Sequence, residues 1–160
     1  MSDQLTPHFS FEEMTRTDNA ALQEQNRNLA QQWRPSLLAT AQLMERIREW
    51  SGPLLVHSAF RCPELNGAAG GVKTSQHMLG QACDFSLCGE QTAQAVDDLF
   101  NKVKSFLGEN QVPFGQLIRE RWSGAGWVHI SLGQPWREAD KCGEVLLMDK
   151  GAYTMLDKIG

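Results

Sequence analysis

The stretch SQHMLGQACDFSL, residues 75–87, decides the fold and the site expected for this chain. Its second half, Gln81 to Leu87, alternates apolar and polar side chains as a β-strand does. Ala82, Asp84 and Ser86 therefore share one face, and three apolar side chains share the other. Because the apolar face points into a core, we expect Asp84 on the more open face, between small residues that leave room for an ion and a substrate.

A second strand, WVHISL at residues 127–132, repeats this pattern with His129 on its polar face. If the two strands pair, His129 and Asp84 lie side by side, and His77 reaches in from the preceding glycine-rich loop. Two imidazole nitrogens and one carboxylate oxygen suit zinc and leave a fourth tetrahedral position for water. Zinc lowers the pKa of such a water to about 7.

Each of these residues also has a structural interpretation. Asp84 would then pair with a lysine, and His129 would be a half-buried histidine with its hydrogen bonds satisfied. His57 shares a strand face with Leu55 and Ala59, so we expect it to be structural.

The remaining chain predicts an α+β domain over residues 1–160, with a mainly antiparallel sheet and helices on one face. Apolar residues at helical spacing predict helices over about 35–50 and 92–107. A capping box at Ser10–Glu13 predicts a short helix, whereas the polar residues 18–33 read as loop with one helical turn. The further expected elements are strands over 54–60, 115–121 and 143–148 and a turn into a short helix at 61–66.

Composition narrows the class of partner. The 160 residues carry a net charge of -4 and no run of Lys or Arg, which argues against nucleic acid. We expect no secretory signal, because the first 14 residues lack a basic start and an apolar stretch, and no membrane insertion. The four cysteines form no C-x-x-C pair and are expected to be free thiols.

Three ordered motifs resemble the M15 peptidases, the D-Ala-D-Ala carboxypeptidase and LAS group. Residues 75–84 read as S-x-H-x-x-G-x-A-x-D, and residues 127–131 read as W-V-H-hydrophobic-S. Residues 58–66 resemble that family's S-x-Y-R-x-P-x-x-N segment, and residues 9–14 are similar to the start of compact phage members. The resemblance spans roughly residues 9–132. It implies a LAS-type (hedgehog/D-Ala-D-Ala peptidase-like) fold and zinc ligands at His77, Asp84 and His129.

The resemblance also implies that Arg61 contacts substrate and steadies negative charge on the reacting carbonyl, the alternative being a surface salt bridge. Many members carry an acid or a histidine three residues before the last zinc histidine, where this chain has Gly126. We therefore expect Glu120 to be the general base, unless it pairs with Arg119 or Arg121. Ser75, Gln76 and Trp127 are the remaining candidates for substrate binding or for orienting a ligand.

The expected function is zinc-dependent hydrolysis of peptide bonds in bacterial peptidoglycan, either as a D-Ala-type carboxypeptidase or as an endopeptidase. A monomeric phage endolysin or virion lysin, made in the cytoplasm and delivered by a holin or a tail, fits the absent signal. The alternatives are a catalytically inactive zinc-containing module that binds the cell wall, and a metal-free phage structural protein. Trp122, Trp127 and Trp136 either line a substrate groove or pack as core and rim residues.

Overall fold

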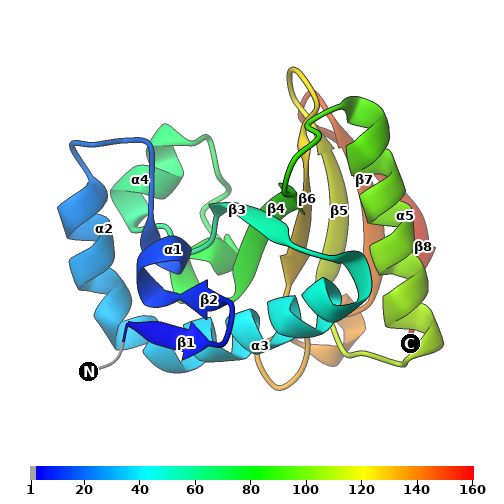
Figure 1. The fold of residues 1–160 in the computed structure, drawn as a ribbon, viewed down its shortest axis with the longest axis horizontal. Helices are drawn as coiled ribbons and strands as arrows, with labels where there is room; N and C mark the ends of the chain where they lie inside the picture. Colours follow the sequence, from blue (N-terminus) through cyan, green and yellow to red (C-terminus); the bar gives the residue numbers. More distant parts are fainter. Residues whose placement is uncertain (1–2) are drawn as a thin grey trace. The chain divides into compact units, whose positions relative to one another are not determined.

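The structure, a computed structural model, describes residues 3–160 (Figure 1). Met1 and Ser2, the first residues of the segment tested for a secretory signal, lie outside the described part. Its α-helices are α1 (Phe11–Thr15), α2 (Gln23–Ala30), α3 (Arg34–Ser51), α4 (Pro63–Ala68) and α5 (Ala93–Glu109). Its strands are β1 (Gln4–Thr6), β2 (Phe9–Ser10), β3 (Leu54–Ser58), β4 (Ala82–Leu87), β5 (Gln116–Arg121), β6 (Trp127–Ser131), β7 (Glu144–Asp149) and β8 (Ala152–Lys158). The described helices include none with the length and apolarity that a bilayer span requires.

The described chain forms two compact units. One comprises residues up to Arg46 together with Val56–Cys83, and the other comprises Ile47–Leu55 and Asp84–Gly160. The boundaries fall within α3, β3 and β4, so the chain passes from one unit to the other inside regular elements. The single domain expected over residues 1–160 stays a prediction.

The fold is α+β, with a mixed sheet of strand order β3-β4-β6-β5-β7-β8. Strand β5 pairs antiparallel with β6 and parallel with β7, and β7 pairs antiparallel with β8. The parallel pair arises because β6 returns to the start of β5, so that the connection after β6 begins β7 beside that same end. The sheet is therefore mixed, with the β5–β6 and β7–β8 pairs antiparallel and the β5–β7 pair parallel, and the expected α+β fold is confirmed.

The two long helices follow the expected apolar periodicity. Thr92 caps α5, its hydroxyl accepting a hydrogen bond from the Ala95 N–H at 3.1 Å. The capping-box helix is also confirmed, since the Glu13 N–H donates to Ser10 Oγ at 3.0 Å. The apolar stripe of α5 is buried at Val96, Leu99, Phe100, Val103, Phe106 and Leu107.

The prediction of a loop over residues 18–33 is wrong, because this segment contains α2 and the 3-10 helix η1 (Gln31–Trp33). A fully buried polar side chain, Asn26, fixes α2. Its Nδ2 donates to the carbonyls of Thr15 at 2.8 Å and Phe60 at 3.1 Å, and its Oδ1 accepts from the Cys62 N–H at 2.6 Å. The helix is thus held by the hydrogen bonds of Asn26, and Ala30 is its one buried apolar residue.

One face of the β5–β6 region packs on α5, which runs alongside β5 in Figure 1. Arg119 joins the two elements and is only 2% exposed. Its Nε donates to Asp97 Oδ1 of α5 at 2.7 Å, and Nη2 donates to the Ala93 carbonyl at 3.3 Å. Burial raises the pKa of Asp97, but hydrogen bonds from Arg119 and Arg121 outweigh it and hold that pKa below its ordinary value of 3.8.

The opposite face of the same strands carries two rows of side chains, because residues in register share a face. The first row runs Trp127, Glu120, Met148, Tyr153 across β6, β5, β7 and β8, and the second runs His129, Ile118, Leu146, Met155. Ile118, Leu146 and Met148 form a buried apolar cluster within these rows.

Three strands were not expected from the sequence. The β1–β2 pair has only three and two residues, and every residue of β8 is exposed. An exposed edge strand buries no stripe, so it leaves little apolar pattern to recognise.

All four cysteines are free thiols, with Cys62 and Cys83 buried.

Candidate metal centre and active site

His77 lies in a short 3-10 helix, η2 (Gln76–Leu79), that leads into β4. The Ser75 hydroxyl caps this turn by accepting from the His77 N–H at 3.2 Å. Gly80 follows at φ +67, where a Cβ would come within 2.9 Å of Ser36 Oγ and 3.0 Å of Leu37 Cγ. A side chain there would be strained and crowded, so glycine allows the sharp turn from His77 into the strand.

The imidazole of His77 is oriented by the main chain. Its Nδ1 lies 2.6 Å from the Ala59 carbonyl oxygen, and a carbonyl only accepts hydrogen bonds. Nδ1 therefore carries the proton, and Nε2 is left as the atom that can ligate a metal. His77 is only 3% exposed, so this hydrogen bond, which fixes the tautomer, is shielded from solvent.

Asp84 and His129 lie side by side, as the strand alternation predicts. His129 Nδ1 is 2.8 Å from Asp84 Oδ1, and the two residues are 8% and 3% exposed. The expected open face around Asp84 is wrong, because every residue of β4 except Leu87 is buried. An inner strand of a covered sheet has two buried faces, and alternation alone does not distinguish this case.

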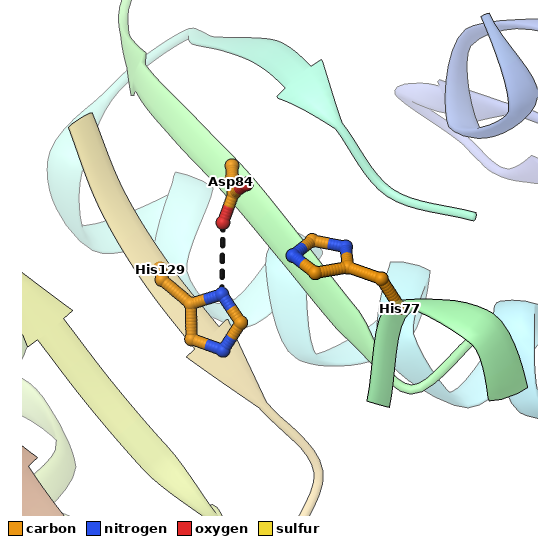
Figure 2. A group of neighbouring side chains, drawn as sticks. All are labelled: His77, Asp84 and His129. Carbon is orange, nitrogen blue, oxygen red and sulfur yellow. Dashed lines mark hydrogen bonds and ion pairs between the residues drawn. The ribbon is translucent and has the colours of Figure 1, made fainter. Parts of the chain in front are cut away.

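Figure 2 shows that the side chains of His77, Asp84 and His129 converge. Their candidate ligand atoms all lie within 4.8 Å of one another. Two ligands of one zinc ion, each bonded at about 2.0–2.2 Å, can be at most about 4.4 Å apart, so small side-chain rotations suffice. The donor set of two imidazoles and one carboxylate also fits zinc, and residues 3–160 contain no other such group.

Glu120 lies on the same sheet face as His129. It pairs with Trp127, two residues along β6 from His129, and His129 itself pairs with Ile118. Arg119 and Arg121 alternate with Glu120 along β5, so their side chains lie on the other sheet face. Both donate there to Asp97 of α5. The backbone thus separates Glu120 from the two arginines considered as its partners and places it on the face of the candidate ligands.

Gly126 has no room for a side chain. It adopts φ +70, and a Cβ would lie 2.1 Å from the Glu120 carbonyl oxygen and 2.7 Å from Arg119 Nη1. The loop between β5 and β6 packs this closely because Arg119 donates to the carbonyls of Glu120 and Ala125, both at 2.9 Å. No acid can occupy position 126 in this loop conformation.

Comparison with known families decides the classification. A family model described as Peptidase M15 matches residues 7–131, which is more than half of the chain. The chain belongs to the M15 peptidase family. No curated protein matches it. The match includes all three candidate ligands and the segment around Arg61, and membership indicates a hydrolase of peptide bonds.

Arg61 of this M15 peptidase is fixed next to one candidate ligand. Its backbone N–H donates to the His77 carbonyl oxygen at 3.1 Å, and its side-chain Nε donates to Ser58 Oγ at 3.0 Å. The side chain is partly exposed, and a guanidinium can form paired hydrogen bonds with a carboxylate. A role in substrate binding remains a prediction.

The other predicted substrate residues have identifiable environments. Ser75 caps the turn that carries His77, and Gln76 donates from Nε2 to Gln81 Oε1 at 3.2 Å. The indole Nε1 of Trp127 is buried and has no hydrogen-bond partner within the described chain. An unpaired buried donor is costly, which makes it a candidate contact for a bound acceptor.

Two features of the structure were not predicted from the sequence. The Ala59 carbonyl, which orients His77, is a main-chain group and has no residue signature. Tyr153 lies in β8, outside the matched residues, and only the strand register reveals its face. Trp122 and Trp136 are exposed, and His57 lies outside the convergent group.

Proposed function

We propose that this M15 peptidase is a zinc enzyme that hydrolyses peptide bonds of bacterial peptidoglycan. The observation that carries the proposal is the convergence of His77, Asp84 and His129, three buried side chains whose ligand atoms lie within 4.8 Å. Burying two imidazoles and a carboxylate together is costly unless they share a cation or protons, so a bound metal accounts for the arrangement.

His77 Nε2, a carboxylate oxygen of Asp84 and a ring nitrogen of His129 would hold the ion. When bound, zinc supplies a Lewis acid that polarises the scissile carbonyl and acidifies a water molecule. The Ala59 carbonyl keeps the His77 tautomer correct for this role.

Glu120 acts in the proposal as the general base. Its carboxylate would take a proton from the attacking water and deliver it to the leaving amine nitrogen as the peptide bond breaks. Support comes from its position on the same face as His129, one register pair away, and from the absence of room for an acid at position 126.

Arg61 and Trp127 would bind the substrate. The guanidinium of Arg61 stays charged and forms paired hydrogen bonds, which suits a carboxylate or the developing oxyanion. Trp127 offers a buried N–H donor beside Glu120. Peptidoglycan peptides containing D-amino acids as substrate, and a phage endolysin or virion lysin as the biological form, are proposals that extend the family resemblance.

The test is hydrolysis of purified peptidoglycan and of a soluble stem peptide ending in D-Ala-D-Ala, with released fragments identified by mass spectrometry. We expect wild-type turnover, and a loss of about 10²-fold in kcat for Glu120→Gln, because general base catalysis contributes about 10²–10⁴-fold. The glutamine keeps the size of the side chain but cannot accept the proton.

Glu49→Gln is the matched control, because it makes the same chemical change at an exposed position of α3. It should retain wild-type turnover. Full activity in Glu120→Gln would remove this residue from the mechanism. An inactive wild type that binds zinc and cell walls tightly would instead identify a non-catalytic wall-binding module.

A further inference from the structure

The C-terminal hairpin of β7 and β8 extends the sheet beyond the family match, which ends at residue 131. Strand β7 pairs with β5, the strand of Glu120, and β8 pairs with β7. The hairpin therefore adds side chains to the face that carries His129 and Glu120.

Tyr153 is the side chain that β8 places in the same row as Glu120. The register Glu120↔Met148↔Tyr153 puts it in the row that begins at Trp127. Two strand spacings of about 4.8 Å separate the backbones of Glu120 and Tyr153, a gap that a long aromatic side chain can largely bridge.

The environment of the phenol agrees with this placement. The pKa of Tyr153 is raised first by desolvation, then by the negative charges of Glu120 and Asp84. The residue is nevertheless 56% exposed. The phenol is thus held in its protonated, donating form, and it is influenced by the charges of the two carboxylates that the proposed chemistry uses.

Apolar side chains share this sheet face with Tyr153. Met148, between Glu120 and Tyr153 in the row, is fully buried, and Ile118 and Leu146 are buried in the adjacent row. Met155, at the end of that adjacent row, is half exposed. A partly exposed aromatic ring and thioether beside a polar site suit a bound peptide, which presents both carbonyl acceptors and small apolar side chains.

We propose that Tyr153 contacts the peptide substrate and orients it, its hydroxyl donating a hydrogen bond to a carbonyl or carboxylate oxygen of the bound chain. This inference rests on the proposed peptidase function. It also assigns a role to a strand that the family match does not include, so the hairpin contributes to substrate selection.

Steady-state kinetics and equilibrium binding test the inference together. The probe is the soluble D-Ala-D-Ala stem peptide, with kcat and KM from hydrolysis and Kd from calorimetry on zinc-loaded protein. Tyr153→Phe removes only the hydroxyl, so we expect KM and Kd to rise about 5-fold with kcat within 2-fold of wild type. Tyr153→Ala also removes the ring and should raise both about 20-fold.

Thr154→Val is the matched control, because it removes a hydroxyl from the next residue of β8, which points to the opposite face. It should leave KM and Kd unchanged, and thermal melts should show all three variants folded. Wild-type KM and Kd in both Tyr153 variants would overturn the inference while leaving the peptidase proposal intact. An inactive wild type would defeat the peptidase proposal, and equal peptide affinity of wild type and Tyr153→Phe would then refute the contact independently.

Discussion

Replacing Asp84 with alanine is expected to lower kcat/KM about 10⁴-fold and to abolish tight zinc binding. The carboxylate is the one anionic member of the convergent group and lies 2.8 Å from His129. Its loss removes both a ligand and the partner that fixes the second imidazole, and about 10⁴-fold corresponds to about 5.5 kcal/mol of transition-state stabilisation. Hydrolysis of the stem peptide and zinc content per chain are the two measurements.

Ser86→Ala is the control for this change. Ser86 is buried in β4 on the same strand face as Asp84, and its hydroxyl donates to Gln91 Oε1 at 2.8 Å. It should keep zinc and most of its activity, whatever it loses in stability. Normal rates with retained zinc in Asp84→Ala would contradict the assignment of this carboxylate.

Arg119→Met is expected to lower the free energy of unfolding by about 3 kcal/mol. Arg119 itself has no direct role in the proposed reaction. The guanidinium is buried and donates to Asp97 and to the carbonyls of Ala93, Glu120 and Ala125. Methionine fills much of the space but leaves these acceptors without their charged donor. Each acceptor that water cannot reach then costs about 1–3 kcal/mol of stability. Urea unfolding followed by circular dichroism measures the change.

Arg121→Met makes the same substitution two residues later, where the arginine is exposed and also donates to Asp97 Oδ1 at 3.0 Å. It should cost less than about 1 kcal/mol. Since the pKa of Asp97 is lowered in the fold, the contribution of this carboxylate is complete above its unfolded pKa and is lost as the pH falls through the folded value. The cost of Arg119→Met should therefore shrink in acid, and equal costs for both arginines would contradict the assigned role.

The sequence predicts elements well where burial is patterned. The apolar stripe of α5 and the alternation of β6 predict both elements correctly, although β6 is buried on both of its faces. Helix α2 is missed because its buried contact is Asn26, a polar residue that reads as loop. Strand β8 is missed because it joins the sheet by backbone pairing and buries none of its residues.

The candidate site divides in the same way. His77, Asp84 and His129 are found from motif spacing, since the ligand types and their strand parity are both visible in the sequence. The orientation of His77 by the Ala59 carbonyl and the lack of space at Gly126 depend on backbone geometry that no residue pattern encodes. Tyr153 requires the registers of three strand pairs.

Anomalous diffraction at the zinc absorption edge, from crystals grown with one equivalent of zinc, tests the central claim most directly. The expected result is one strong anomalous peak, marking a zinc ion about 2.0–2.2 Å from His77 Nε2, Asp84 and His129. A peak at other side chains, such as the thiol of Cys142, with none at these three residues, would contradict the account.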